Sequence, residues 1–128
     1  MSQGYSVSPR ALEIPALKRA IESKPPALAL AEPENYRKSL ARVASIESAS
    51  AYLAPIVQAL IRGLRIPAAF HDHALTGGPL RRLRSVIVGE IEGSDTTFVL
   101  LYERTRQKIN LLWLDQHNDA YETAKLLK

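Results

Sequence analysis

Three apolar segments in the C-terminal part of the chain predict a meander of β-strands. They are LRSVIVGEI at 83–91, TTFVLLYER at 96–104 and INLLWLD at 109–115. β-Branched and aromatic residues are frequent in them, which is typical of strands. The connections EGSD and RTRQK are short enough for hairpins. We therefore expect the three strands to pair antiparallel.

The middle segment is apolar on both of its faces. Successive side chains of a strand point to opposite faces. Phe98, Leu100 and Tyr102 therefore share one face. Val99 and Leu101 share the other. A sheet of this kind needs cover on both sides.

Upstream, the spacing of apolar residues changes to that of helices. Residues 33–43 place Tyr36, Leu40 and Val43 on one stripe, and residues 50–63 carry a strongly apolar face. We expect these two helices to cover one face of the sheet.

The two ends of the chain carry weaker patterns. Ile14, Leu17 and Ile21 recur at helical spacing within residues 1–26, a segment that ends at SKPP. Residues 27–31, ALALA, fit a short strand, and the tail DAYETAKLLK fits a short helix. We expect residues 1–26 and the tail to cover part of the second face.

These elements predict one domain of the α+β class. Two N-terminal helices are expected to pack on a small antiparallel sheet of three to four strands, followed by a short C-terminal helix. Residues 1–26 are the predicted N-terminal extension, and residues 27–128 the domain itself. With 128 residues, of which 46% are hydrophobic, the chain can bury one core.

The composition also bears on the compartment. Cysteine is absent, which excludes disulfides and thiolate metal sites. No apolar run reaches the length of a membrane span, and MSQGYSVSPR lacks the apolar core of a secretory signal. The expectation is a cytoplasmic protein without a membrane partner.

Positive charge is concentrated in one window of the sequence. The net charge is +4, and residues 62–84 hold five arginines against Asp72, while the rest of the chain has twelve basic and twelve acidic residues. The planar fork of arginine suits phosphate. The window therefore favours an anionic partner, above all nucleic acid, over a merely solvated face. The five arginines are Arg62, Arg65, Arg81, Arg82 and Arg84.

Two of the three histidines are candidates for acid–base chemistry, because the pKa of imidazole lies near neutrality. His73 lies in a glycine-containing loop, and His117 follows the last predicted strand, whereas His71 is expected to be solvated. His71 and His73 lack a third ligand nearby, so no metal site is expected. The Gly-Gly-Pro turn lacks the frame of a phosphate-binding P-loop, and no cofactor motif is present.

A series of short motifs follows in a recognisable order. An Asp-His-x-Leu-x-Gly loop at 72–77 precedes a strand bearing Arg84, then FVLLYER, and finally His117 with Tyr121 four residues on. In this order, over residues 33–122, the chain resembles the RelE/YafQ superfamily of toxin endoribonucleases. The resemblance implies the toxin of a type II toxin–antitoxin system, whose antitoxin protein wraps the toxin with a helix.

The resemblance also implies a reaction. Such toxins cleave mRNA at the ribosome without metal or cofactor, by attack of the substrate's 2′-hydroxyl on the adjacent phosphate. A base takes the 2′ proton, an acid protonates the leaving 5′ oxygen, and a cation stabilises the charged phosphorane.

The implied catalytic set is His73, Arg84, His117 and Tyr121. The histidines would supply acid and base, and Arg84 the positive charge. Tyr121 either stacks on a base, places its hydroxyl near the phosphate, or packs the tail on the sheet. The expected RNA contacts are Arg62, Arg65, Arg81 and Arg82.

Two features depart from the family pattern. Ile87 stands where such toxins carry a second histidine, and GEIEGSDTTF lacks their Asp-Trp pair. Two alternatives therefore stay open. One is a ParE-like inhibitor of DNA gyrase with the same fold, and the other is a catalytically inactive RNA-binding relative. The placement of His73 and His117 favours the nuclease over the gyrase inhibitor.

Overall fold

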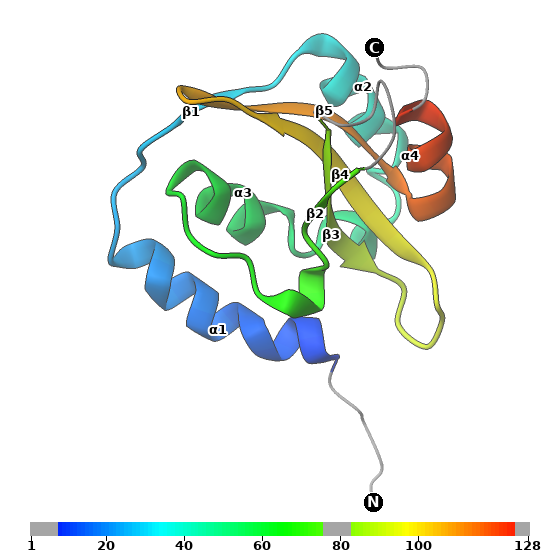
Figure 1. The fold of residues 1–128 in the computed structure, drawn as a ribbon. Coiled ribbons are helices and arrows are strands. Elements are labelled where there is room, and N and C mark those ends of the chain that lie inside the picture. Colours follow the sequence, from blue (N-terminus) through cyan, green and yellow to red (C-terminus); the bar gives the residue numbers. More distant parts are fainter. Residues whose placement is uncertain (1–7, 76–82, 125–128) are drawn as a thin grey trace, which may run out of the picture.

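The structure, a computed structural model, describes residues 8–75 and 83–124. This part of the chain forms an α+β domain (Figure 1). The α-helices are α1 (Pro9–Glu22), α2 (Glu34–Arg42), α3 (Leu53–Ile61) and α4 (His117–Ala124). The strands are β1 (Ala29–Ala31), β2 (His73–Ala74), β3 (Arg84–Glu90), β4 (Thr97–Arg104) and β5 (Lys108–Gln116). Two 3-10 turns are η1 (Glu47–Ser50) and η2 (Ala68–Phe70). Among the helices of the described residues, none combines the length and apolar character that a membrane span needs.

The strands form one mixed sheet in the order β1-β5-β4-β3-β2. The predicted antiparallel meander of β3, β4 and β5 is confirmed. The prediction of an entirely antiparallel sheet of three to four strands is wrong, because β1 pairs parallel with β5 and β2 adds a fifth strand. β2 has two residues, too few for a recognisable period. The direction of β1 depends on how the helical connections return the chain, which local sequence does not encode.

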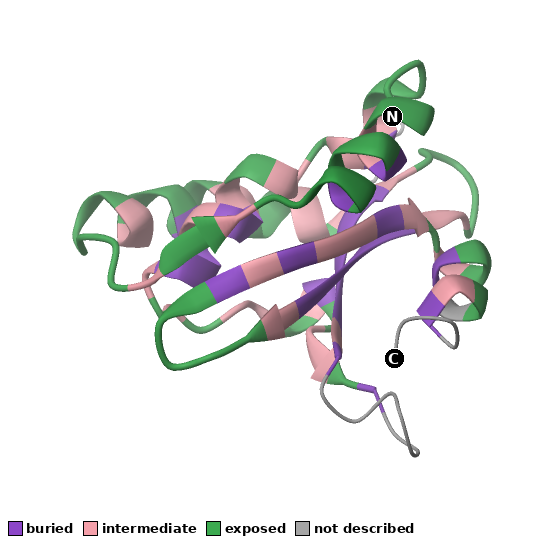
Figure 2. Ribbon diagram, turned by 90° about the horizontal axis from the view of Figure 1, so that it is seen from above, coloured by how far each residue is buried: buried purple, intermediate pink, exposed green. Residues whose placement is uncertain are grey.

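Both faces of β4 are buried, as its alternation predicted. Phe98, Leu100 and Tyr102 lie in the larger core, with residues of α1, α2 and α3. Val99 and Leu101 lie in a second core that includes residues of α4. The neighbouring strand β5 alternates in a similar way, with buried residues separated by half-buried ones (Figure 2). The predicted cover of one face by α2 and α3 is therefore confirmed, as is the C-terminal helix on the other.

The prediction that residues 1–26 cover the second face of the sheet is wrong for helix α1, which packs on the first face. Leu17 is buried in the larger core, where Ile14 and Ile21 pack against it. Figure 1 shows α1 beside α3, on the same side of the sheet. The core on the second face is formed instead by residues that include Leu75, Leu83 and those of α4.

A polar network centred on one carboxylate fastens the start of α1 to the domain. Glu90 accepts hydrogen bonds from Ser8 Oγ at 2.7 Å and Tyr52 Oη at 2.8 Å, and it pairs with Arg10 Nη1 at 3.2 Å. Arg10 Nε also donates to the carbonyl of Ala69 at 2.8 Å. Burial, and then the bond to Glu90, raise the pKa of Tyr52. Helix α1 is thereby joined to both the sheet and η2.

Gly89 allows the sheet to approach η1 closely. A Cβ atom at this position would lie 2.2 Å from the carbonyl oxygen of Ala49 and 2.3 Å from that of Ser48. Both neighbours are backbone atoms, which cannot rotate away. The β3–β4 register also shifts between Ile87 and Gly89. This bulge brings the Val88 carbonyl to the backbone N–H of Tyr52, which donates to it at 2.8 Å.

We expect Gly89→Ala to lower the free energy of unfolding by about 3 kcal/mol or more, because the added methyl group forces the sheet and η1 apart. Gly93→Ala is the control. Gly93 has φ +80° but nothing within 4 Å of an added Cβ, so only backbone strain of about 1–2 kcal/mol applies. Urea unfolding followed by circular dichroism measures both. Equal losses in the two variants would contradict the close approach.

Candidate functional site

Asp72, Arg84 and Tyr102 form a closed hydrogen-bonded triangle at one end of the sheet. Arg84 begins β3 and is paired in register with Tyr102 of β4, while Asp72 immediately precedes β2. Tyr102 Oη donates to Asp72 Oδ1 at 2.6 Å. Arg84 donates from Nε to Tyr102 Oη at 3.1 Å and from Nη2 to Asp72 Oδ2 at 3.3 Å. The guanidinium is therefore fixed from two sides.

The turn before β2 places Asp72 in this triangle. His71 adopts a left-handed conformation with φ 54°, and its backbone N–H donates to the Ala68 carbonyl at the end of η2. Such a conformation costs a residue other than glycine about 1–2 kcal/mol. His73 Nδ1 lies 2.7 Å from the carbonyl of His71, which supports the same turn. His71 itself is exposed, as predicted.

The electrostatics of the triangle keep its phenol protonated and its arginine charged. Burial, followed by the hydrogen bond to Asp72, raises the pKa of Tyr102. Burial lowers the pKa of Arg84, but its bonds to Tyr102 and Asp72 outweigh that effect and leave the pKa above its ordinary value. At neutral pH the phenol therefore donates to the carboxylate, and Arg84 holds a permanent positive charge beside it.

A cleft of about 590 Å³ opens beside the triangle, between the sheet and the segment that follows α3. Its lining includes Arg65, Arg84 and Arg104, with Asp72 as its one acidic side chain among the described residues. Three guanidinium groups against one carboxylate leave a surplus of two positive charges. The cleft can therefore hold an anion.

Two of the predicted RNA-binding arginines are described by the structure. Arg65 lines the cleft. Arg62 instead donates to the carbonyls of Lys24 and Gln58, so its guanidinium ties the N-terminal segment to the end of α3. The predicted contacts Arg81 and Arg82 lie outside the described residues, as does the side chain of Tyr121.

Arg104 was not among the predicted contacts, because it lies outside residues 62–84, where the excess of positive charge is concentrated. A signal was available in the strand period. Arg104 is two residues after Tyr102 on β4, and side chains two apart in a strand point to the same face. Once Tyr102 is assigned to the face of the larger core, Arg104 belongs beside it.

His73 lies on the other face of the sheet. It is paired in register with Ser85, and it is two residues before Leu75, which belongs to the second core. The strand period therefore directs His73 to the face that α4 covers, opposite the Arg84 triangle. Ile87 is buried on this same face, against Val99 and Ala120.

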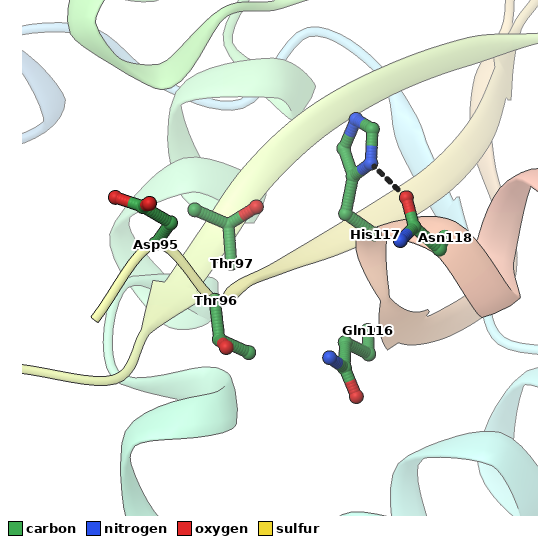
Figure 3. A pocket seen from close by; sticks show the side chains of 6 residues that line it. All are labelled: Asp95, Thr96, Thr97, Gln116, His117 and Asn118. Atoms are coloured by element: carbon green, nitrogen blue, oxygen red, sulfur yellow. Dashed lines mark hydrogen bonds between the residues drawn. The ribbon is translucent and has the colours of Figure 1, made fainter.

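His117 comes from α4, the helix that packs on that face. As the first residue of α4, it lines a separate pocket of about 360 Å³ with Asp95, Thr96, Thr97, Gln116 and Asn118 (Figure 3). Its Nδ1 is 3.2 Å from Asn118 Oδ1. Three strand spacings, about 14 Å, separate β2 from β5. His73, on β2, does not line this pocket, so the described structure does not bring the two histidines together in one site.

The fold, though not the sequence, matches known proteins. By sequence the chain matches no protein-family model and no curated protein. The structure is similar to that of a copper-bound mutant toxin from Helicobacter pylori, with TM-score 0.61, 20% identity, and coverage of 72% of this chain and 97% of that chain. It is also similar to a chain of the Escherichia coli DinJ–YafQ toxin–antitoxin complex, with TM-score 0.60, 20% identity, and coverage of 74% and 98%. A YafQ mutant from E. coli gives TM-score 0.55 at 18% identity, over 73% and 98%. The chain therefore has the fold of the YafQ-type toxins.

We expect Tyr102→Phe to lower the free energy of unfolding by about 1–3 kcal/mol, because Asp72 loses its buried donor. The pH dependence should change as well. The folded-state pKa of Tyr102 is raised, so its contribution is complete below about pH 10 and is lost as the pH rises toward the folded-state value. Urea unfolding from about pH 7 to pH 11 should show a shallower alkaline decline in the variant. Identical declines in both proteins would contradict this role of Tyr102.

Proposed function

We propose that this chain is the toxin of a toxin–antitoxin pair and acts on RNA as a metal-independent endoribonuclease. The observation that carries the proposal is the fixed guanidinium of Arg84 beside the edge strand that bears His73, in a fold shared with YafQ. An arginine held in this way meets a phosphate without losing further side-chain freedom.

The proposed reaction is cleavage of mRNA at the ribosome. The 2′-oxygen bonds to the adjacent phosphorus, the bond to the 5′-oxygen breaks, and a cyclic phosphate and a 5′-hydroxyl result. His73 and His117 are the candidates for the base that takes the 2′ proton and the acid that protonates the leaving oxygen. Arg84 contributes positive charge for the phosphate, and Tyr121 a ring or hydroxyl for the substrate.

The proposed partners follow from the same fold. A toxin of this kind pairs with an antitoxin protein, and the E. coli neighbour is a toxin–antitoxin complex. The RNA contacts proposed from the sequence are Arg62, Arg65, Arg81 and Arg82. Arg65 is supported by its place in the cleft. Arg62 is the weakest of the four, because its guanidinium already bonds two backbone carbonyls.

A second candidate function is RNA binding without cleavage. Two observations favour it. Ile87 is only 8% exposed and places an apolar side chain on the face that α4 covers, at the position where the resemblance implies a second histidine. The two histidines are also separated by three strand spacings. A scissile phosphate over Ile87 would have no imidazole at that position.

We expect His73→Ala and His117→Ala each to reduce mRNA cleavage by about 10²- to 10⁴-fold, as the loss of a general acid or base does. His71→Asn is the matched control, because asparagine tolerates the left-handed conformation and the carbonyl that faces His73 is retained. The readouts are growth arrest after induction and mapping of mRNA 5′ ends, with folding checked by circular dichroism.

Toxicity of the folded double alanine variant, with no mRNA cut by either protein, would exclude the nuclease. DNA damage signalling in those cells would then indicate gyrase inhibition. If the wild type binds RNA and cuts none, Ile87→His is the decisive variant. New cleavage after that substitution would show that the binder lacks only the central imidazole.

A further inference from the structure

Four cationic side chains gather on the face of the sheet that is opposite His73. Arg65, Arg84 and Arg104 line the cleft after α3. Lys24 joins them from the N-terminal segment. A Cβ atom placed on Gly63 would lie 3.7 Å from Arg104 Nη2 and 3.9 Å from Lys24 Nζ. The ends of these two side chains therefore approach one point from different parts of the chain.

Within the described residues, no carboxylate forms a salt bridge with Lys24, Arg65 or Arg104. Across residues 8–75 and 83–124, Lys24, Arg65 and Arg104 form no salt bridge, and none of their side chains has a hydrogen bond. Asp72 is the acidic side chain in the lining, and it is held by Arg84 and Tyr102. Like charges that converge without acids repel one another, and a bound anion relieves that repulsion.

The position of Lys24 is fixed by the backbone rather than by its own side chain. Arg62 Nε donates to the Lys24 carbonyl at 2.8 Å. The N–H groups of Ala27 and Leu28 both donate to the carbonyl of Ile61 at 2.9 Å. The segment that follows α1 is thus held against the end of α3, and it brings its lysine to the mouth of the cleft.

The cleft and the proposed cleavage face meet at one short edge of the sheet. Asp72 and His73 are consecutive, yet Asp72 bonds the triangle on one face while His73 belongs to the face of Leu75. An extended polyanion that crosses the β2 edge can therefore contact both faces. Arginine suits the phosphate contact, because Arg84 uses only Nε and Nη2 on its protein partners.

We propose that Lys24, Arg65 and Arg104 form a binding site for a backbone phosphate of single-stranded RNA, next to the phosphate for which Arg84 is proposed to supply positive charge, so that the RNA strand passes over the β2 edge. This rests on the proposed action on RNA, and it gives the N-terminal segment a role in holding the substrate. The phosphate in this site is held and is not cut.

The test is binding of a short fluorescein-labelled single-stranded RNA with 2′-O-methyl riboses, which cannot be cleaved, to the full chain by fluorescence anisotropy. We expect Arg65→Ala/Arg104→Ala to weaken binding by about tenfold or more for each phosphate that the protein no longer binds. The slope of log K against log salt should also become shallower by about 0.7 for each such phosphate. Adding Lys24→Ala should extend both effects.

The matched control is Arg37→Ala/Arg106→Ala, which removes the same charge from two exposed arginines outside the cleft lining. It should retain the wild-type salt slope and nearly all of the affinity. Circular dichroism checks that both double variants fold. Equal losses in the two variants, or an unchanged affinity after Arg65→Ala/Arg104→Ala, would overturn the site.

Cleavage is measured separately, with unmodified RNA and the wild-type protein. If no RNA is cut but the cleft variant still loses affinity and salt slope, the nuclease proposal fails and the phosphate site stands. If RNA is cut and the cleft variant binds like the wild type, the nuclease stands and the phosphate site fails.

Discussion

The central strand β4 has to bury both of its faces, and the rest of the domain is arranged around that requirement. Phe98 and Leu100 turn toward α1, α2 and α3, which precede the meander, and Val99 and Leu101 turn toward α4. Burying one such side chain contributes about 1.5–3 kcal/mol. No single helix can cover both faces, so the chain must place helices before and after the meander. The two faces thereby acquire different neighbours and can serve different chemistry.

Burial of a polar atom then determines the geometry of the site. Tyr102 is 1% exposed, and a phenol hydroxyl in such a position needs a partner. Asp72 supplies an acceptor, and Arg84 adds a donor. The turn at His71 is required to bring Asp72 there. Because the next residue of the chain is His73, the same turn places the candidate base across the sheet edge from the fixed arginine.

The proposed ribonuclease activity combines two tasks, proton transfer and phosphate binding, and the two faces of the sheet divide the residues proposed for them. The candidate acid and base, His73 and His117, are assigned to the face under α4, which also carries Ile87. The opposite face gathers guanidinium groups that suit phosphate binding but cannot exchange protons near neutral pH. In the proposed phosphate site, the segment after α1 contributes Lys24.

The sequence by itself determined the meander, the two-sided burial of β4, the helices over residues 33–43 and 50–63, and the resemblance to YafQ-like toxins. These follow from local periodicity and from motifs that are contiguous in the chain. Tertiary structure alone decided the parallel pairing of β1, the two-residue strand β2 and the docking of α1 on α3. It also decided that Arg62 bonds backbone carbonyls while Arg104 joins the cleft. A charge count along the chain cannot distinguish the roles of these two arginines. Their roles depend on contacts with residues that are distant in the sequence, a backbone carbonyl for Arg62 and the other cations of the cleft for Arg104, and these contacts form only on folding.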